Sequence, residues 1–231
     1  MVKYVWRYCE LKGLSSVPQF VLETWVGDIQ RIFCNGFERR KEWPVESIRR
    51  KLDHSSLLGF LIDEADSNTA TFGYAIYHVP DNLLNGKALL WEEAICLVKN
   101  MHIRGKGLAN TAITNAIGHF PNLRFGFIGG RTQNPLVFRR YSEFGKLFPF
   151  DITYTSDEGR DLMLFLKSHI TDVSNAKQID PLTGICQGQY SEGRLGNYEV
   201  SVRGTEQFEL KLKEWEFDRD RGDALIVVAK S

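Results

Sequence analysis

A short basic, glycine-containing loop stands between a strand-like run and a helix-like run near the middle of the chain. The run Trp91–Val98 reads as a strand, and positions 108–117 carry apolar residues at helical spacing. Between them lies the loop Arg104-Gly105-Lys106-Gly107-Leu108-Ala109. The first turn of a helix has N–H groups without intrahelical acceptors and a partial positive charge, and glycine lets an anion approach them. The segment therefore predicts a strand–loop–helix unit that binds a phosphorylated ligand.

Three loop patterns can be compared with this segment. The dinucleotide fingerprint G-x-G-x-x-G fails because Asn110 stands where its third glycine or alanine should be, and the nucleotide P-loop fails because Asn100 replaces its first glycine. The pattern R/Q-x-x-G-x-G/A is satisfied in full by Arg104, Gly107 and Ala109. Here the chain resembles the GNAT superfamily of N-acetyltransferases, whose loop of this pattern binds the pyrophosphate of acetyl-coenzyme A (acetyl-CoA). The plain alternative is a basic turn that leads into a helix.

The resemblance implies a catalytic base and a coenzyme-binding strand just before the loop. Members of the superfamily can use a carboxylate eleven residues ahead of the Arg or Gln position as general base, and that residue here is Glu93. A base is needed because a lysine-like amine is protonated near pH 7 and attacks only when neutral. The alternative for Glu93 is a solvated or salt-bridged strand carboxylate. The resemblance also implies that backbone groups of Leu97, Val98 and Lys99, where the strand splays, pair with the pantetheine amides.

A second motif of the superfamily lies downstream of the loop. It consists of an asparagine, a tyrosine seven residues later and a glycine shortly after, and Asn134, Tyr141 and Gly145 match it. The resemblance implies that Asn134 reaches the pantetheine arm and that Tyr141 assists departure of the thiolate as a proton donor. The alternatives from residue chemistry alone are a plain N-cap for Asn134 and a core aromatic for Tyr141. Gly145 is expected to end the helix as a C-cap.

The composition excludes several classes of protein. Of the 231 residues, 43% are apolar and 25% are charged, as is typical of a globular protein. Lys+Arg and Asp+Glu both number 29, and this balance argues against a broad surface for nucleic acid or membranes. No apolar run reaches the length of a transmembrane helix, and the first residues do not resemble a signal peptide. We expect a cytoplasmic protein with no nucleic-acid and no membrane partner.

The cysteines and histidines predict neither disulfides nor a metal site. Cys9, Cys34, Cys96 and Cys186 are widely scattered, without a C-x-x-C pair, and the five histidines form no H-x-x-x-H pair. We therefore expect reduced thiols and no metal cofactor.

Alternating helix-like and strand-like runs predict an acetyltransferase domain of the α+β class over residues 1–170. Residues 17–53 read as two helices divided at Trp43-Pro44, and the basic cluster Arg49-Arg50-Lys51 is expected to be a solvated helix face. The runs 57–63, 71–77, 88–98, 123–128 and 162–166 read as strands, with helices after the loop and after Asn134. The expected architecture is a GNAT-like mixed, mostly antiparallel central sheet flanked by helices.

Residues 171–231 are predicted to form a linker and a small C-terminal antiparallel β extension of unknown role. Residues 171–196 are polar and have no clear periodicity. Strand-like alternation follows at Tyr198, Val200 and Val202, and again at Phe208, Leu210 and Leu212, before the apolar run 224–228.

Together these residues predict an enzyme that moves an acetyl group from acetyl-CoA to a primary amine by direct attack in a ternary complex. Because no covalent enzyme intermediate is required, Cys96 is predicted to be dispensable. Three alternatives stay open: a CoA-binding sensor or interaction module without catalysis, a transferase with another acyl donor, and an interaction protein that works through residues 171–231. No motif identifies the acceptor, which is a small molecule or a protein, or the oligomeric state.

Overall fold

The computed structural model describes residues 3–37, 43–65, 71–99, 103, 106–190, 193 and 203–231. The chain divides into two units, and each is described by itself. Unit 1 comprises Met1–Val79 and Glu92–Asn122, and unit 2 comprises Pro80–Trp91 and Leu123–Ser231. Strand β4 (Ala88–Leu97) begins in unit 2 and ends in unit 1.

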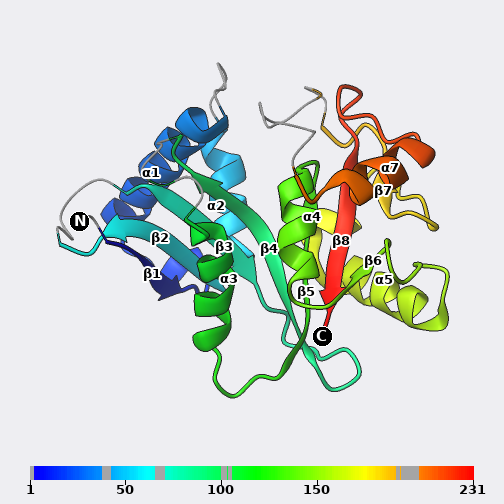
Figure 1. Cartoon of the computed structure of the whole chain (residues 1–231). Helices are drawn as coiled ribbons and strands as arrows, with labels where there is room; N and C mark the ends of the chain where they lie inside the picture. The colour runs from blue at the N-terminus through cyan, green and yellow to red at the C-terminus, as the bar shows by residue number, and fades with distance from the viewer. Residues whose placement is uncertain are drawn as a thin grey trace. The chain divides into compact units, whose positions relative to one another are not determined.

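The strands form a mostly antiparallel sheet, to which the described residues contribute eight strands. Besides β4, these are β1 (Tyr4–Glu10), β2 (Leu57–Asp63), β3 (Gly73–His78), β5 (Phe125–Thr132), β6 (Lys146–Phe148), β7 (Ile185–Cys186) and β8 (Ala224–Lys230). Their order is β1-β2-β3-β4-β5-β8-β6, with β7 paired to β8. The pairs β1/β2, β2/β3, β5/β8, β6/β8 and β7/β8 are antiparallel. The predicted mixed sheet with flanking helices is confirmed (Figure 1).

In unit 1, helices cover both faces of the strands. After the 3-10 turn η1 (Leu14–Ser16), α1 (Gln19–Phe37) and α2 (Val45–Asp53) bury their apolar sides against the strand face that carries Leu58 and Ile76. Helix α3 (Leu108–Gly118) contacts Tyr8, which pairs with Gly59, the residue after Leu58. Because successive strand residues point to opposite faces, α3 lies on the other face. The two helices predicted in 17–53 are confirmed.

Unit 2 is built around β8, which lies between β5 and β6. Apolar side chains of β8 and of α5 (Asp157–His169) form its core together with Trp91 and Phe148. The other helices of the unit are α4 (Pro135–Ser142), α6 (Thr171–Ser174) and α7 (Glu206–Glu214).

Asp223, immediately before β8, ties the loops of unit 2 together. Its side chain has no exposed surface. Its carboxylate accepts hydrogen bonds from the backbone N–H groups of Gly188 (2.9 Å) and Asp218 (3.0 Å) and from the Nε atom of Arg221 (3.0 Å). A buried carboxylate is stable only when it is bonded in this way, so Asp223 fixes the approach to β8.

The strand predicted at 162–166 is wrong, because these residues lie in α5. Leu162, Phe165 and Leu166 are buried, whereas Leu164 is 65% exposed, which is the pattern of one helical face. The Ser156 side chain caps the helix by accepting a hydrogen bond from the N–H of Gly159. A short continuous apolar run does not distinguish a strand from a buried helix segment. Here the Ser156 cap indicates a helix.

Within the expected C-terminal β extension, the strand predicted at Phe208, Leu210 and Leu212 is wrong, and the strand predicted at 224–228 is confirmed. Phe208 and Leu212 are buried and Leu210 is exposed because residues 206–214 form α7, not a strand. Residues 224–230 are a strand as predicted, but it pairs with β5 and β6 inside the sheet. Tyr198, Val200 and Val202 lie outside the described residues. The division into domains at 170/171 stays a prediction.

The expected C-cap glycine of α4 has a different role. The helix ends at Ser142 with Glu143 as its C-cap, and Gly145 follows with a φ of 150°. A Cβ at this position would collide with the carbonyl oxygen of Lys230. Gly145 therefore allows the chain to pass close to the end of β8.

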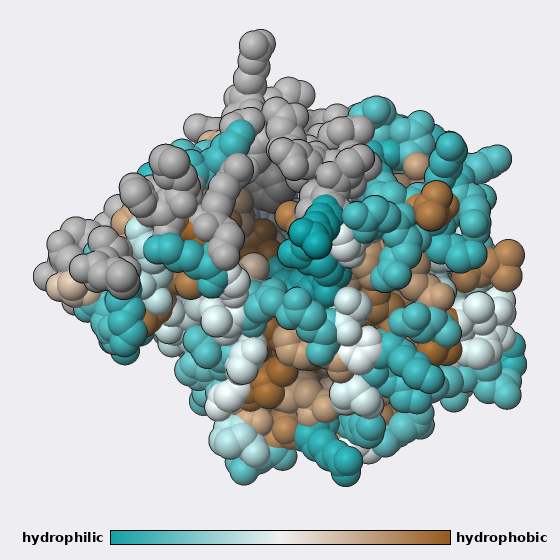
Figure 2. Space-filling model, in the orientation of Figure 1, coloured by the Kyte–Doolittle hydropathy of each residue, from teal (hydrophilic) through white to brown (hydrophobic). Residues whose placement is uncertain are grey.

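Apolar residues on the surface are mostly scattered. The largest exposed fractions belong to Phe20 (72%), Leu164 (65%) and Leu210 (65%), which lie on three different helices. On the face shown in Figure 2, hydrophobic residues form small patches among hydrophilic ones. In the part of the chain that the structure describes, no helix is both long and apolar enough to cross a membrane.

Candidate functional site

The start of α3 has the backbone geometry expected of an anion site. Gly107 is the N-cap residue, with a φ of 66° and a ψ of 14°, a left-handed conformation that favours glycine. The first turn contains no acidic residue, and the N–H groups of Leu108 and Ala109 have no acceptor within the helix. A Cβ built on Gly107 meets no atom within 4 Å, so the approach is open. Arg104 and Gly105 lie outside the described residues.

Two aromatic side chains of β1 hold α3 in place. The indole Nε1 of Trp6 donates a hydrogen bond to the carbonyl oxygen of Leu108 at 2.9 Å, and the Tyr8 hydroxyl donates to that of Ala112 at 2.7 Å. The Tyr8 ring lies against Gly59 of β2, where a Cβ would meet the ring. Burial, and to a lesser extent the charge of Glu92, raises the pKa of Tyr8 far above its ordinary value, so its hydroxyl stays a donor.

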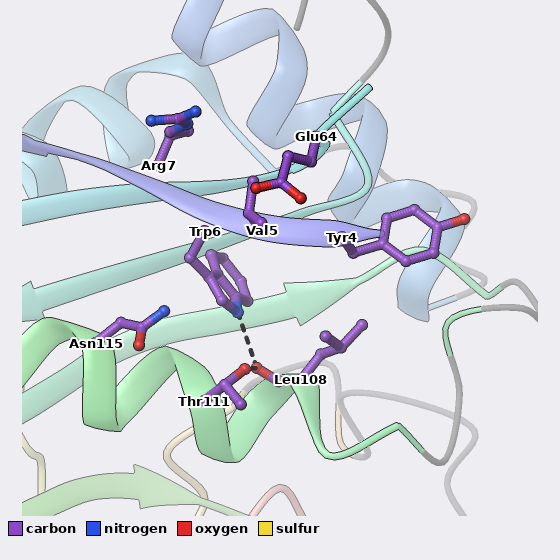
Figure 3. Close-up of a pocket in the computed structure, with 8 residues that line it drawn as sticks. All are labelled: Tyr4, Val5, Trp6, Arg7, Glu64, Leu108, Thr111 and Asn115. Carbon is purple, nitrogen blue, oxygen red and sulfur yellow. Dashed lines mark hydrogen bonds between the residues drawn. The ribbon is translucent and has the colours of Figure 1, made fainter. Parts of the chain in front are cut away.

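A cavity of about 430 Å³ lies between β1 and the first turns of α3 (Figure 3). It is lined by Tyr4, Val5, Trp6, Arg7, Glu64, Leu108, Thr111 and Asn115. In Figure 3, Trp6 points from the strand toward the helix, whereas Arg7 points to the other side of the strand. The Nζ atom of Lys106 lies 5.5 Å from the centre of the Tyr4 ring, a cation–π contact at the same end of α3. The cavity therefore adjoins the start of the helix, where the anion site is predicted.

Glu93 is salt-bridged and lies on β4 in unit 1. Its Oε2 atom is 2.6 Å from the Nζ atom of Lys51, and the two side chains are 7% and 16% exposed. Lys51 also donates to the backbone carbonyl oxygen of Glu93 at 3.3 Å. The prediction that Lys51 belongs to a solvated helix face is wrong, because it follows Ile48 by three residues at the edge of the buried side of α2. The pair thus places an amine nitrogen within hydrogen-bond distance of the carboxylate that is predicted to be the general base.

The backbone after Glu93 is less open than the resemblance implies. Leu97 is the last residue of β4. The N–H of Val98 donates to the carbonyl oxygen of Phe72 at 2.9 Å, and the N–H of Lys99 donates to the Oδ1 atom of Asn35 at 2.8 Å. Both N–H groups that were expected to be available for pantetheine amides therefore have acceptors within unit 1.

Asn134 and Tyr141 lie in unit 2, on α4. The Asn134 side chain caps this helix by accepting a hydrogen bond from the N–H of Leu136 at 3.0 Å, with Pro135 at the first helical position, so the predicted N-cap is confirmed. Tyr141 is fully buried, and the guanidinium of Arg140 lies 5.2 Å from the centre of its ring. The coenzyme-binding and proton-donating roles of these two residues stay predictions.

The thiols show no activated nucleophile among the described residues. All four cysteines are free. Cys96 on β4 is buried, and its Sγ atom is 3.6 Å from the carbonyl oxygen of Ile32. Burial raises the pKa of the Cys96 thiol to about 12, so the thiol is protonated at neutral pH.

Three residues that shape this site were not predicted from the sequence. Trp6 and Tyr8 belong to β1, a strand that we did not predict, although Tyr4, Trp6 and Tyr8 alternate as strand residues do. Lys51 was assigned to a solvated face, although its position three residues after Ile48 places it beside the apolar side of the helix. These two spacings were the available signals.

Comparison with known proteins finds likeness at the level of structure only. No family model matches the chain, and no curated protein sequence matches it. Among solved structures, 197 chains match, and several of them are named as acetyltransferases.

Three of these structures illustrate the range of the match. The NatC complex bound to Gag peptide and CoA is 15% identical, with a TM-score of 0.41 over 61% of this chain and 83% of its own. An IAA acetyltransferase from Bacillus cereus is 10% identical, with a TM-score of 0.45 over 99% and 100%. A GNAT family acetyltransferase from Streptococcus pneumoniae is 14% identical, with a TM-score of 0.39 over 62% and 87%.

Proposed function

We propose that this chain is an acetyltransferase of the GNAT superfamily that moves an acetyl group from acetyl-CoA to a primary amine. The proposal is supported mainly by the backbone conformation at the start of α3. The pattern R-x-x-G-x-A at 104–109 coincides with a left-handed Gly107 at the N-cap, where the N–H groups of Leu108 and Ala109 have no acceptor within the helix. This is the backbone arrangement that binds a phosphate without help from side chains.

The residues present fit the pyrophosphate of the coenzyme. Gly107 leaves open space for a phosphate, the first turn carries no carboxylate to repel it, and Lys106 adds an exposed cation at the same end of the helix. Trp6 and Tyr8 fix the helix axis, and hence the direction of its N–H groups, before any ligand arrives. Such preorganisation lowers the entropic cost of binding.

The proposed reaction is direct attack of the amine on the thioester. Glu93 accepts the amine proton, directly or through one water molecule, and the neutral nitrogen attacks the carbonyl carbon. Backbone groups of the Leu97–Lys99 stretch hold the coenzyme arm once the N–H groups of Val98 and Lys99 exchange their present acceptors for it. Asn134 is a further contact. Tyr141 assists departure of the thiolate. Holding both substrates together replaces a bimolecular encounter by a reaction within one complex.

Binding of the donor can be tested by thermal unfolding with and without CoA. A ligand at a hundred times its Kd stabilises a fold by about 2.7 kcal/mol, which corresponds to a rise in Tm of roughly 5–10 °C for a chain of this size. Gly107→Val should weaken this effect because a β-branched residue is strained at a φ of 66°. Gly118→Val at the far end of α3, where a Cβ also meets no atom within 4 Å, is the matched control. No shift with millimolar CoA would contradict the proposal.

A second candidate function is a CoA-binding sensor without catalysis. Its support is that Glu93 is already paired with Lys51 and that Tyr141 is fully buried. Glu93→Gln and Tyr141→Phe separate the two candidates, with thiol release measured over a panel of amines and peptides. An enzyme should lose turnover in both variants while its Kd for CoA stays unchanged. Acetyl-CoA binding without thiol release for any acceptor would favour the sensor.

A further inference from the structure

The Lys51–Glu93 pair places a primary amine where the proposed reaction needs one. Lys51 Nζ lies 2.6 Å from Oε2 of Glu93, within the 2.6–3.2 Å reach of a general base and the proton it removes. We propose that Lys51 is itself an acetyl acceptor and that the chain acetylates this lysine from acetyl-CoA. The proposal rests on the acetyl transfer proposed above and names one acceptor for it.

The fold holds the Lys51 amine in position. Ile48 and Leu52 are fully buried and fix the rotation of α2 around its axis. Lys51 lies in the last turn of the helix, where the helix dipole favours a cation, and its carbonyl oxygen accepts a hydrogen bond from the Ser55 hydroxyl at 2.6 Å. The entropy of orienting the amine is therefore already lost in the folded chain, which is the condition for fast intramolecular transfer.

The pair is less exposed than three other lysine–glutamate pairs of the described residues, Lys3–Glu64, Lys211–Glu214 and Lys230–Glu158, of which the last is 33% and 32% exposed. Lys3–Glu64 and Lys211–Glu214 both have Nζ–Oε2 distances of 2.7 Å, but Lys3 is 72% exposed and Lys211 is 50% exposed. Lys51 is only 16% exposed. Water competes less for a buried amine and carboxylate, so proton transfer within the pair is more favourable there than at the surface.

The step balances in atoms and charge. The Lys51 ammonium gives one proton to the Glu93 carboxylate, and the neutral nitrogen attacks the thioester carbon. A C–N bond forms, the C–S bond breaks, and its electron pair leaves with sulfur. The second proton lost by the nitrogen protonates the thiolate, and Glu93 returns its own proton to solvent. The products are N-acetyl-Lys51, CoA thiol and one proton.

Acetylation would change the site as well as the lysine. An N-acetyl group carries no positive charge, so it cannot form the ion pair with Glu93. Self-acetylation thus removes the Lys51 cation from beside the proposed base.

The test uses the purified full chain, acetyl-CoA and no external amine, with peptide mass mapping of each lysine over time. Lys51 should be acetylated roughly a hundredfold faster than Lys3 and Lys211, the lower end of what a positioned general base contributes. Uncatalysed acetylation has the opposite order, because it favours the exposed amines. Equal or slower acetylation of Lys51, with CoA bound, would overturn the proposal.

Three variants complete the test. Glu93→Gln should slow Lys51 acetylation roughly a hundredfold while leaving the Kd for CoA unchanged. Glu214→Gln, which removes the partner of Lys211, should leave the Lys51 rate unchanged, and Lys51→Arg should remove the modification and keep CoA binding. An unchanged rate in Glu93→Gln refutes the role of the pair. Failure of the wild type to bind CoA in calorimetry refutes the acetyltransferase proposal itself, which separates the two failures.

Discussion

Tyr8→Phe tests the hydrogen bond by which β1 holds α3. The substitution removes one oxygen atom, the donor to the Ala112 carbonyl at 2.7 Å, and leaves the ring against Gly59. The carbonyl keeps its partner within the helix, so no buried acceptor is left unsatisfied. The loss is therefore the net value of one hydrogen bond, about 1 kcal/mol of unfolding free energy, or roughly 2–4 °C in Tm.

The dependence of this loss on pH gives a sharper test. Burial first, and the charge of Glu92 second, raise the pKa of Tyr8 in the folded chain far above its value near 10 in the unfolded chain. Stability from the neutral phenol is then fully present below pH 10 and is lost as the pH rises above it. At pH 11 the wild type loses about 1.4 kcal/mol in this way, and the phenylalanine variant loses none.

Urea unfolding of both proteins at pH 8, 10 and 11 measures the effect. The deficit of Tyr8→Phe at pH 8, about 1 kcal/mol, should be slightly reversed at pH 11, where the wild type loses about 1.4 kcal/mol. The other tyrosines contribute equally to both proteins and cancel. Tyr154→Phe should behave in the same way, because the Tyr154 hydroxyl donates to Ile226 in the core of unit 2 and burial raises its pKa as well. A difference between wild type and Tyr8→Phe that does not change with pH would refute the reasoning.

Three further predictions concern the loops, the thiols and the donor site. Burial alone would raise the pKa of Asp223, but hydrogen bonds from Arg221 and two backbone N–H groups outweigh it and lower the pKa. Its stabilisation is therefore present above about pH 4 and lost in acid, so Asp223→Asn should cost about 3 kcal/mol at pH 7 and flatten acid denaturation below pH 4. Cys96→Ala should keep CoA binding and turnover, because the buried thiol stays protonated; a folded variant without turnover would contradict this. Trp6→Phe should weaken CoA binding about fivefold in calorimetry by removing the donor to Leu108, whereas Trp25→Phe on α1 should not.

Much of the fold follows from patterns that lie within one segment. Residues 21, 25, 29 and 33 are spaced by four, and the structure has α1 there. The predictions of secondary structure failed where the local sequence pattern fits both a helix and a strand, or where a strand pairs with a distant segment. Residues 162–166 are apolar throughout, and only the Ser156 cap and the exposed Leu164 distinguish a helix from a strand. The strand β1 pairs with Leu57–Asp63, about fifty residues away. Because no short turn joins the two strands, the sequence around β1 does not indicate this pairing.

The candidate site divides in the same way. The loop before α3 could be recognised because a helix start, a left-handed glycine and a basic residue are encoded within six positions. The Lys51–Glu93 pair could not, because its members are 42 positions apart and meet only when α2 lies along β4. A basic cluster on a helix reads as solvated unless the rotation of that helix is known. The burial of Ile48 and Leu52 supplies that rotation.

The Lys51–Glu93 pair also decides between the two functions proposed for the start of α3. In a sensor the pair has only a structural role. Lys51 would then remain an ammonium with acetyl-CoA as well as with CoA. A transferase needs the carboxylate to take a proton, so the pair must open for an external amine or react itself. The two functions use the same coenzyme loop, but they differ in whether the 2.6 Å contact between Lys51 and Glu93 must break or react. The chemical state of Lys51 after exposure to acetyl-CoA, compared with exposure to CoA, is therefore more informative about function than coenzyme affinity, which both functions predict equally.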